Sequence, residues 1–296
     1  MSASEILDAA ANVLVPTYAP LPIVPAVAAG STVTDTEGNS YIDLGAGIAV
    51  TALGHNPPVL HAALMAQADR LWHVSNIFAN EPAIRLAERL VSVSFADRVF
   101  FSNSGAEANE AALKLARRHA YNKGLTDKYE IIALDGAFHG RTLFTVSVGG
   151  TAAYKEGFGP PLEGIVHITP NSVDELLAAI SERTCAVIVE PIQGEGGVRP
   201  LDIEFLQAAR AACDANDALL IFDEIQTGAG RTGTLYAYEQ MGVVPDVLTT
   251  AKGLGGGIPI GATLVAGDAA EALGRGSYGT TFGAIHRARR CVGVAR

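Results

Sequence analysis

An α/β fold, with a mostly parallel sheet covered by helices on both faces, is the architecture that this sequence predicts. Short apolar segments alternate with longer segments in which apolar residues recur at helical spacing. The short segments are almost continuously apolar, as expected for strands buried on both faces of a parallel sheet. The chain has 296 residues, of which 49% are hydrophobic and 18% charged, so it can form a large core.

The elements follow in order along the chain. Residues 1–30 look like an irregular lead-in, and residues 31–43 alternate around Glu37-Gly38-Asn39 as a hairpin does. Residues 44–55 are small and apolar, which indicates tight packing or an interface. The expected helices cover residues 57–71, 81–93, 106–122, 173–180 and 203–215, and the expected strands cover residues 98–102, 129–134, 185–190, 218–222, 247–250 and 262–266. Ligands of such sheets bind beyond the carboxyl ends of the strands.

Composition excludes several classes of partner. The net charge of -10 argues against nucleic acid or an anionic membrane surface. No apolar run is long enough to cross a bilayer, and the first residues lack the basic region of a signal peptide. Cys185, Cys213 and Cys291 show neither metal-ligand spacing nor a disulfide framework. We therefore expect a cytoplasmic protein without a metal site.

Lys252 and Asp223 each follow an apolar strand. Lys252 precedes a glycine-rich loop, which suits an amine that forms an imine with a carbonyl ligand, although an ordinary surface lysine also fits. Asp223 lies at the end of the apolar strand expected at residues 218–222. A carboxylate is costly to bury there unless it is paired. It could form a strand-end salt bridge, or it could keep a ring nitrogen protonated. Gln226, three residues later, could reach a neighbouring phenolic oxygen.

Two earlier strand ends carry further candidates. Gly105 and Ala106 start a helix whose backbone amides could bind an anion, although a serine-capped helix start explains the same pattern. Phe138 offers a flat face for a ring, or core packing. Arg141 offers a bidentate fork for a carboxylate, or a surface salt bridge. His139 fits a buried, hydrogen-bonded histidine with no catalytic part.

The segment 190–197 ends a strand in a loop broken by glycines and carries two carboxylates. Glu195, between two glycines, is expected to be mobile and exposed, and a solvated loop charge explains it equally well. Glu190 fits a side chain that caps a backbone donor. Gly228-Ala-Gly-Arg-Thr-Gly233 matches a dinucleotide-binding fingerprint, but residues 224–227 separate it from the strand, so we reject that interpretation.

Together these parts describe a site for pyridoxal phosphate (PLP). The phosphate would lie on the helix start at Gly105, the ring on Phe138, the ring nitrogen at Asp223 and the aldehyde at Lys252. The same sequence resembles the class III (subgroup II) aminotransferases of fold type I from about residue 18 to residue 283. The stretches that carry this resemblance are residues 47–55 (GIAVTALGH), 138–150 (FHGRTLFTVSVGG), 190–197 (EPIQGEGG) and 222–226 (FDEIQ).

The resemblance implies a role for each candidate. Lys252 would form the Schiff base and carry the proton in the transfer. The other cofactor-binding residues would be Gly105 and Ala106 at the phosphate, Phe138 at the ring face, Asp223 at the ring nitrogen, Gln226 at the phenolic oxygen and Thr281 at the phosphate of a partner subunit. Substrate would be bound by Arg141 at the α-carboxylate, by Thr280 nearby, and by Glu195 as a gate that admits an amino donor or 2-oxoglutarate. A homodimer with shared active sites follows.

The resemblance also implies a division of the chain. Residues 1–56 would be part of a small domain, residues 57–283 a PLP-binding large domain, and residues 284–296 an aberrant tail that replaces the family's Gly-Asn-Pro-Leu and C-terminal domain. Because dropping one base from codons for Gly-Ala-Ile-His restores Gly-Asn-Pro, we hypothesise a frameshift that resequencing can test. Loss of that domain, and of the arginine that pairs with Glu195, predicts weak or absent activity.

The sequence leaves two functions open and a third disfavoured. The first is transfer of an amino group from an N-acylated diamino acid, N2-acetylornithine, to 2-oxoglutarate in arginine biosynthesis, with ornithine, succinylornithine or 4-aminobutyrate as alternative donors. The second is a non-catalytic remnant that binds PLP or a sister subunit. The third, a dinucleotide oxidoreductase, depends only on the segment 228–233.

Overall fold

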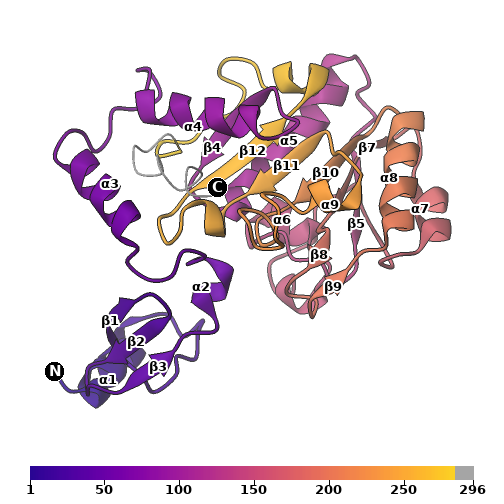
Figure 1. Cartoon of the computed structure of the whole chain (residues 1–296). Helices are drawn as coiled ribbons and strands as arrows, with labels where there is room; N and C mark the ends of the chain where they lie inside the picture. Colours follow the sequence, from indigo (N-terminus) through magenta and orange to yellow (C-terminus); the bar gives the residue numbers. More distant parts are fainter. Residues whose placement is uncertain (284–296) are drawn as a thin grey trace.

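A seven-stranded sheet forms the centre of the protein in the computed structural model, which describes residues 1–283 (Figure 1). The strand order is β4-β12-β11-β10-β7-β5-β6. Of these seven strands, β12 alone runs in the direction opposite to the other six, so the predicted mostly parallel sheet is confirmed. The strands are β4 (Arg98–Ser102), β5 (Glu130–Leu134), β6 (Ile165–Ile168), β7 (Thr184–Val189), β10 (Leu219–Asp223), β11 (Val247–Thr250) and β12 (Gly261–Val265).

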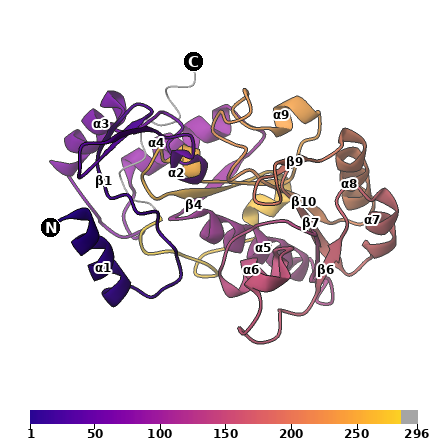
Figure 2. The ribbon, with the colours of Figure 1, turned by 90° about the horizontal axis from the view of Figure 1, so that it is seen from below.

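Helices cover both faces of the sheet because the strand side chains on both faces are apolar. In β7, Val187 and Val189 face one core cluster, whereas Ala186 and Ile188 face the other. The first cluster contains residues of α4 (Glu81–Ser92), α7 (Val173–Ala179), α8 (Ile203–Ala215) and α9 (Tyr238–Met241). The second contains residues of α5 (Gly105–Asn122) and α6 (Leu143–Val148). Figure 2 shows α5 and α6 on one side of the strands and α4 and α9 on the other.

The N-terminal residues form a separate small unit. The strands β1 (Pro25–Ala29), β2 (Thr32–Asp35) and β3 (Ser40–Ile42) make an antiparallel sheet beside α1 (Ala3–Val13). Figure 1 shows this unit apart from the central sheet, connected through α2 (Ala46–Ala49) and α3 (Pro58–Ala68). The predicted hairpin is thereby confirmed, while the predicted domain boundary between residues 56 and 57 stays a prediction.

The structure corrects or completes several expectations for the elements. The lead-in of residues 1–30 is not irregular, because it contains α1 and β1. Helix α6, strand β6 and the short ribbon β8 (Ile192–Gln193) with β9 (Arg199–Pro200) were not expected. Tight packing in residues 44–55 holds at Gly54, where an added Cβ would lie 2.9 Å from the Gly30 carbonyl oxygen. Leu44 and Ile48 are exposed, so for these two residues the alternative of an interface stays a prediction.

Three further sequence expectations concern a membrane span, the cysteines and the C-terminal tail. No helix within residues 1–283 is long and apolar enough to cross a membrane. Cys185 and Cys213 are free and buried. The predicted aberrant tail, which includes Cys291, lies outside the described residues.

Candidate active site

A cavity of about 450 Å³ lies at the edge of the sheet where the parallel strands end. Asp223 reaches it from the end of β10, Lys252 from the residues after β11, and Phe138 from the loop after β5. Gly105 and Ala106 reach it from the start of α5. Parallel strands bring their carboxyl ends to one edge, so loops that are distant in sequence meet there.

Asp223 is the buried acid of this cavity, with 3% of its surface exposed. Its Oδ2 accepts hydrogen bonds from Asn109 Nδ2 at 2.7 Å and from the ring Nδ1 of His139 at 2.8 Å. Its Oδ1 accepts one from the backbone amide of Ile225 at 3.0 Å. Thr249 Oγ1 in turn donates to Asn109 Oδ1 at 2.7 Å, which fixes the amide of Asn109. Oδ1 retains a lone pair for a further donor, because a carboxylate oxygen accepts two hydrogen bonds.

His139 is fully buried behind Asp223. Burial lowers the pKa of its imidazolium, but the hydrogen bond and charge of Asp223, together with the charge of Glu190, outweigh burial and raise the pKa above its usual value. Its Nε2 is buried without a hydrogen-bond partner among the described residues. The interpretation of His139 as a buried, hydrogen-bonded histidine is confirmed, although the sequence did not identify Asp223 as its partner.

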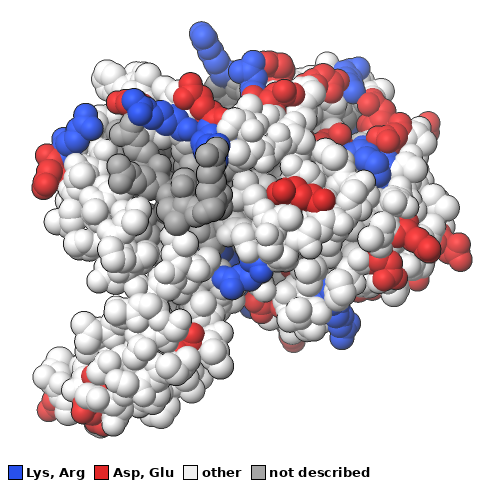
Figure 3. Space-filling view, viewed as in Figure 1, with Lys and Arg blue, Asp and Glu red and all other residues white. Residues whose placement is uncertain are grey.

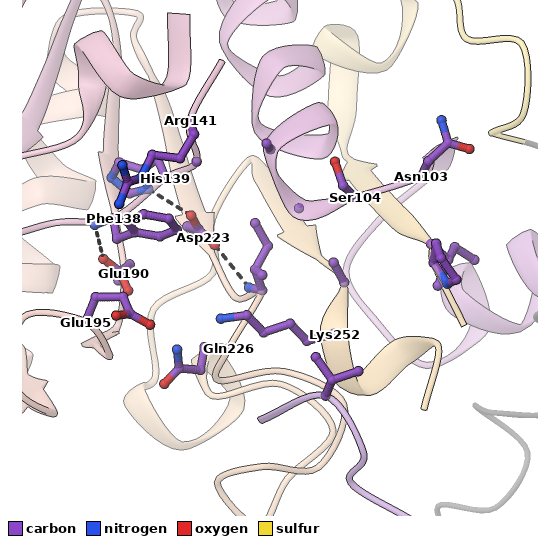
Figure 4. A pocket seen from close by; sticks show the side chains of 18 of the residues that line it. Asn103, Ser104, Phe138, His139, Arg141, Glu190, Glu195, Asp223, Gln226 and Lys252 are labelled. Atoms are coloured by element: carbon purple, nitrogen blue, oxygen red, sulfur yellow. Dashed lines mark hydrogen bonds and ion pairs between the residues drawn. The ribbon is translucent and has the colours of Figure 1, made fainter. Parts of the chain in front are cut away.

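Glu190 fixes the backbone on two sides of the cavity. Its Oε1 accepts from the amide of Phe138 at 2.8 Å and its Oε2 from the amide of Gly194 at 3.2 Å, as Figure 4 shows for the first of these. Burial raises the pKa of this carboxyl, His139 opposes that effect and the charge of Asp223 adds to it. The prediction that Glu190 caps a backbone donor is confirmed for both amides.

The start of α5 presents backbone amides to the cavity. Ser104 caps the helix by accepting from the amide of Glu107 at 3.2 Å, so the predicted cap exists. The amides of Gly105 and Ala106 precede the first intrahelical bond, and no acceptor is seen for them within residues 1–283. A Cβ at Gly105 would lie 2.7 Å from Ile225 Cδ1, so glycine allows this helix start to pack against the loop after β10. An anion fits here by hydrogen bonding and by the helix dipole.

Lys252 has an unusual backbone for a residue with a side chain. Its φ of 41° lies in the left-handed region, which is strained for a non-glycine residue. It forms no ion pair with any carboxylate in the described part of the chain. Figure 4 shows the side chains of Lys252, Asp223, Phe138 and Gln226 converging on one space. The arrangement leaves the amine available to react with a carbonyl group.

Arg141, Glu195 and Gln226 complete the cavity wall. The guanidinium carbon of Arg141 lies 3.4 Å from the ring centroid of Tyr154 and 5.7 Å from that of Phe138. A Cβ at Gly194 would lie 2.3 Å from Gln226 Oε1, so this glycine leaves room for the Gln226 amide. Arg141 therefore has aromatic partners rather than the surface salt bridge that the sequence allowed.

Thr280 and Thr281 do not line this cavity. They line another pocket with Ser75, Asn76 and Ile77. Asn76 Nδ2 donates to the Thr280 carbonyl oxygen at 2.6 Å, and Asn103 Nδ2 donates to Thr280 Oγ1 at 3.1 Å. The sequence placed Thr281 at the phosphate of a partner subunit, so a separate position within one chain is compatible with that prediction.

Sequence reasoning missed two neighbours of the site. Asn109 carries a readable signal, because it is a polar residue on the buried face of an alanine-rich helix. Tyr154 carries none, because the turn that contains it was not expected. The segment 228–233 lies outside the cavity lining and continues as turns, with the next helix beginning only at Tyr238, so its rejection as a dinucleotide motif stands. No group of metal-ligating side chains is found within residues 1–283.

Comparison with known proteins decides the family. The model of the family described as aminotransferase class-III matches residues 14–288. The chain belongs to this family. Class-III aminotransferases depend on PLP, so the predicted family, fold class, PLP cofactor and transaminase class are confirmed.

Curated relatives of this class-III aminotransferase are similar over most of its length. An acetylornithine aminotransferase of Pseudomonas putida is 58% identical over 272 residues, which are 92% of this chain and 67% of that protein. A succinylornithine transaminase/acetylornithine aminotransferase of Pseudomonas aeruginosa is 57% identical over 270 residues, which are 91% of this chain and 66% of that protein. The chain thus spans about two thirds of the length of these relatives.

Solved structures share the fold. The ornithine aminotransferase of Toxoplasma gondii superposes with a TM-score of 0.93 at 34% identity and covers 99% of this chain and 70% of that one. The N-acetylornithine aminotransferase of Stenotrophomonas maltophilia superposes with a TM-score of 0.81 at 43% identity, covering 97% of this chain and 70% of that one.

The residues present fit PLP. The free amides at Gly105 and Ala106 suit its phosphate, and the remaining lone pair on Asp223 Oδ1 suits a protonated ring nitrogen. The half-buried ring of Phe138 supplies a flat face, and the amine of Lys252, which has no ion-pair partner within residues 1–283, supplies a nucleophile.

Proposed function

We propose that this chain transfers the amino group of N2-acetylornithine to 2-oxoglutarate, as a cytoplasmic enzyme of arginine biosynthesis. The observation that carries the proposal is that Lys252 and Asp223 line one cavity of about 450 Å³, large enough for a ring between them. The names of the relatives from Pseudomonas support acetylornithine as the donor, with succinylornithine as an alternative. The Toxoplasma gondii structure keeps ornithine as a third candidate.

PLP, when bound, supplies an electron-accepting ring beside the carbon that loses its proton. In the proposed assignment, Asp223 holds the ring nitrogen in its protonated form. Asn109 and His139 keep the Asp223 carboxylate in place by hydrogen bonds at 2.7 and 2.8 Å. The raised pKa of His139 favours an imidazolium, which stabilises ionised Asp223 in a buried setting.

Lys252 moves the proton at the substrate carbon that carries the amino group. Its amine has no carboxylate partner among residues 1–283, so it is free to accept that proton. The amides of Gly105 and Ala106 would hold the phosphate, Phe138 the ring face and Gln226 the phenolic oxygen. These contacts would hold the reacting carbon beside the Lys252 amine. Holding the two groups together lowers the entropic part of the reaction barrier.

Arg141 and Glu195 bind substrate at the cavity wall. The guanidinium would hold the α-carboxylate of the donor, since Arg141 forms no ion pair in the described part of the chain. Glu195, in a loop of glycines, would accept an amino donor and move aside for 2-oxoglutarate. Each substrate then presents its reacting carbon to Lys252.

A homodimer completes this proposal. Thr280 and Thr281 line a pocket separate from the cavity, which suits a role at the site of a second subunit. Large apolar side chains are exposed near the N-terminal unit and α3, among them Leu44, Ile48, Ile77 and Phe78. Figure 3 shows uncharged residues over most of the N-terminal unit, which supports contact with a second copy.

The visible absorbance of the purified chain with PLP tests the function. We expect a band from lysine-bound cofactor that is lost in Lys252→Ala, because Lys252 is the one amine among the described residues that line the cavity. Lys114→Ala, which removes a lysine of α5 outside the cavity lining, is the matched control. Addition of acetylornithine should change the band. A band that persists in Lys252→Ala contradicts the site, and a band indifferent to every candidate donor contradicts the transfer.

A further inference from the structure

Arg141 lies in a corner formed by two aromatic rings. The rings of Phe138 and Tyr154 are perpendicular, with an interplanar angle of 89° and centroids 6.0 Å apart. The Arg141 guanidinium carbon is 3.4 Å from the Tyr154 centroid and 5.7 Å from the Phe138 centroid. The shorter distance shows that Tyr154, which does not line the cavity, is the main partner of this arginine.

A close backbone contact just after the end of α6 brings Tyr154 to this position. The amide of Gly150 donates to the Ala137 carbonyl oxygen at 2.8 Å, and a Cβ at Gly150 would lie 2.2 Å from the Gly136 nitrogen. The chain after α6 therefore returns directly onto the loop that carries Phe138 and Arg141. The short helix η1 (Ala152–Tyr154) then places the tyrosine ring against the guanidinium.

Stacking on a ring leaves the edge of a guanidinium free. A planar guanidinium held over an aromatic face keeps its N–H donors available in its own plane, where a carboxylate binds bidentately. Arg141 is exposed and has no acidic partner in residues 1–283, so without the ring its long side chain would sample many rotamers. Tyr154 thereby removes in advance part of the entropy that ordering Arg141 would cost on binding.

We propose that Tyr154 is a positioning residue that orients Arg141 for the carboxylate of the substrate. The inference rests on the proposed function, because that function supplies the carboxylate. The aromatic face is the operative feature: no hydrogen bond of the Tyr154 hydroxyl is found in the described part of the chain. Loss of the ring should weaken carboxylate binding about five- to tenfold, as expected for one stacking contact and its ordering effect.

Two variants separate the ring from the hydroxyl. Tyr154→Phe keeps the stacking face, whereas Tyr154→Leu removes it. Tyr154→Met, a longer side chain without a ring, replaces the leucine variant if that variant does not fold. The full chain is used throughout, and thermal unfolding checks that the variants are folded.

The first readout is the side-chain NMR signal of Arg141, assigned by its loss in Arg141→Lys. Ring current should shift this signal in the wild type and in Tyr154→Phe. Most of the shift should disappear in Tyr154→Leu, where only the Phe138 ring remains, 5.7 Å from the guanidinium carbon. A shift of unchanged size without the Tyr154 ring overturns the inference. This readout requires neither cofactor nor turnover.

The second readout is calorimetric binding of glutarate, a dicarboxylate without an amino or keto group. We expect the affinity of Tyr154→Phe to lie within twofold of the wild type and that of Tyr154→Leu to fall about five- to tenfold. Equal affinities, or a wild type that binds no glutarate, overturn the inference. The chain could show this order of glutarate affinities and yet have no transfer activity. That result would contradict the proposed function and leave the role of Tyr154 intact.

Discussion

The central sheet and the N-terminal unit of this protein are held together in different ways. Every residue of β7 and β10 is buried. In residues 1–56, only Asp35 is buried, and no residue of α1 is. The sheet is therefore stabilised by apolar burial on both faces, whereas the hairpin of the N-terminal unit depends on polar contacts around one carboxylate.

This difference explains where the candidate active site lies. All the cavity residues except Val50 come from the chain after α4, and most follow buried strands or begin α5. A packed sheet holds its strand ends rigidly, which fixes Asp223 and Lys252 relative to one another. The N-terminal unit instead exposes apolar side chains such as Leu44 and Ile48, which supports the proposal that it contacts another chain.

The largest predicted effect tests this contrast in stability. Phe205 of α8 is 1% exposed in the core under the sheet, and Val27 of β1 is 68% exposed. Phe205→Ala should lower the free energy of unfolding by about 3–5 kcal/mol, because it removes a buried ring and leaves a cavity. Val27→Ala, a smaller truncation at an exposed position of the N-terminal unit, should change it by less than about 0.5 kcal/mol. Chemical denaturation of both variants measures the difference, and equal losses would contradict the contrast.

The next effect concerns Glu224, a buried carboxyl beside Asp223. Its oxygens accept from the amides of Ala237 and Tyr238 at 2.6 and 2.9 Å and from Thr227 Oγ1 at 3.1 Å. Burial raises the pKa of Glu224 to about 7 despite these donors. A raised pKa means that its contribution to stability is complete below about 4.5 and is lost as the pH rises through about 7.

Replacement of Glu224 should remove this dependence. The wild type should lose up to ~3 kcal/mol between about pH 4.5 and pH 7 through this group, whereas Glu224→Gln should show a flatter profile over that range. Unfolding free energies across the pH range measure both. The prediction fails if the two profiles stay parallel.

The smallest predicted effect is the pH dependence of stability that comes from Asp35 in the N-terminal unit. Its sign is opposite to that of Glu224. Burial would raise the pKa of Asp35, but hydrogen bonds from Asn39, Tyr41 and Glu37 outweigh it and lower the pKa. The contribution of Asp35 is therefore present above its unfolded pKa, about 3.9, and is lost as the pH falls through its folded pKa. Below that pH the hairpin amides should exchange faster, while those of β7 stay protected.

Asp35→Asn sharpens the same comparison at neutral pH. In the wild type, Asp35 Oδ2 accepts hydrogen bonds from Asn39 Nδ2 at 3.0 Å and from Tyr41 Oη at 2.9 Å. The variant keeps the size of the side chain but replaces one carboxylate oxygen with an amide nitrogen, so one acceptor is lost. Hydrogen exchange should increase in β2 and β3 without a change in the central sheet. Faster exchange throughout the molecule would show that the two regions unfold together.

Sequence patterns located six of the seven strands of the central sheet to within one residue at each end, and missed β6. The strand expected at 218–222 is β10 at Leu219–Asp223, and the helix expected at 57–71 is α3 at Pro58–Ala68. Apolar continuity and helical spacing report burial directly, so these predictions succeeded. Helix α1 was missed although Ser2 and Glu5 form a capping box, because none of its residues is buried and composition suggested a lead-in.

The identities of the chemical groups were determined by the sequence alone. A lysine and an aspartate at strand ends, a glycine at a helix start and an arginine after an aromatic residue are local facts, and their order along the chain indicated the cofactor. Only the tertiary structure decided the partners of these groups. His139 and Asn109 on Asp223, and Tyr154 on Arg141, are contacts between segments that lie 13 to 114 residues apart. No periodicity or propensity encodes such contacts, because they depend on how the strands are ordered and how the loops at their ends pack.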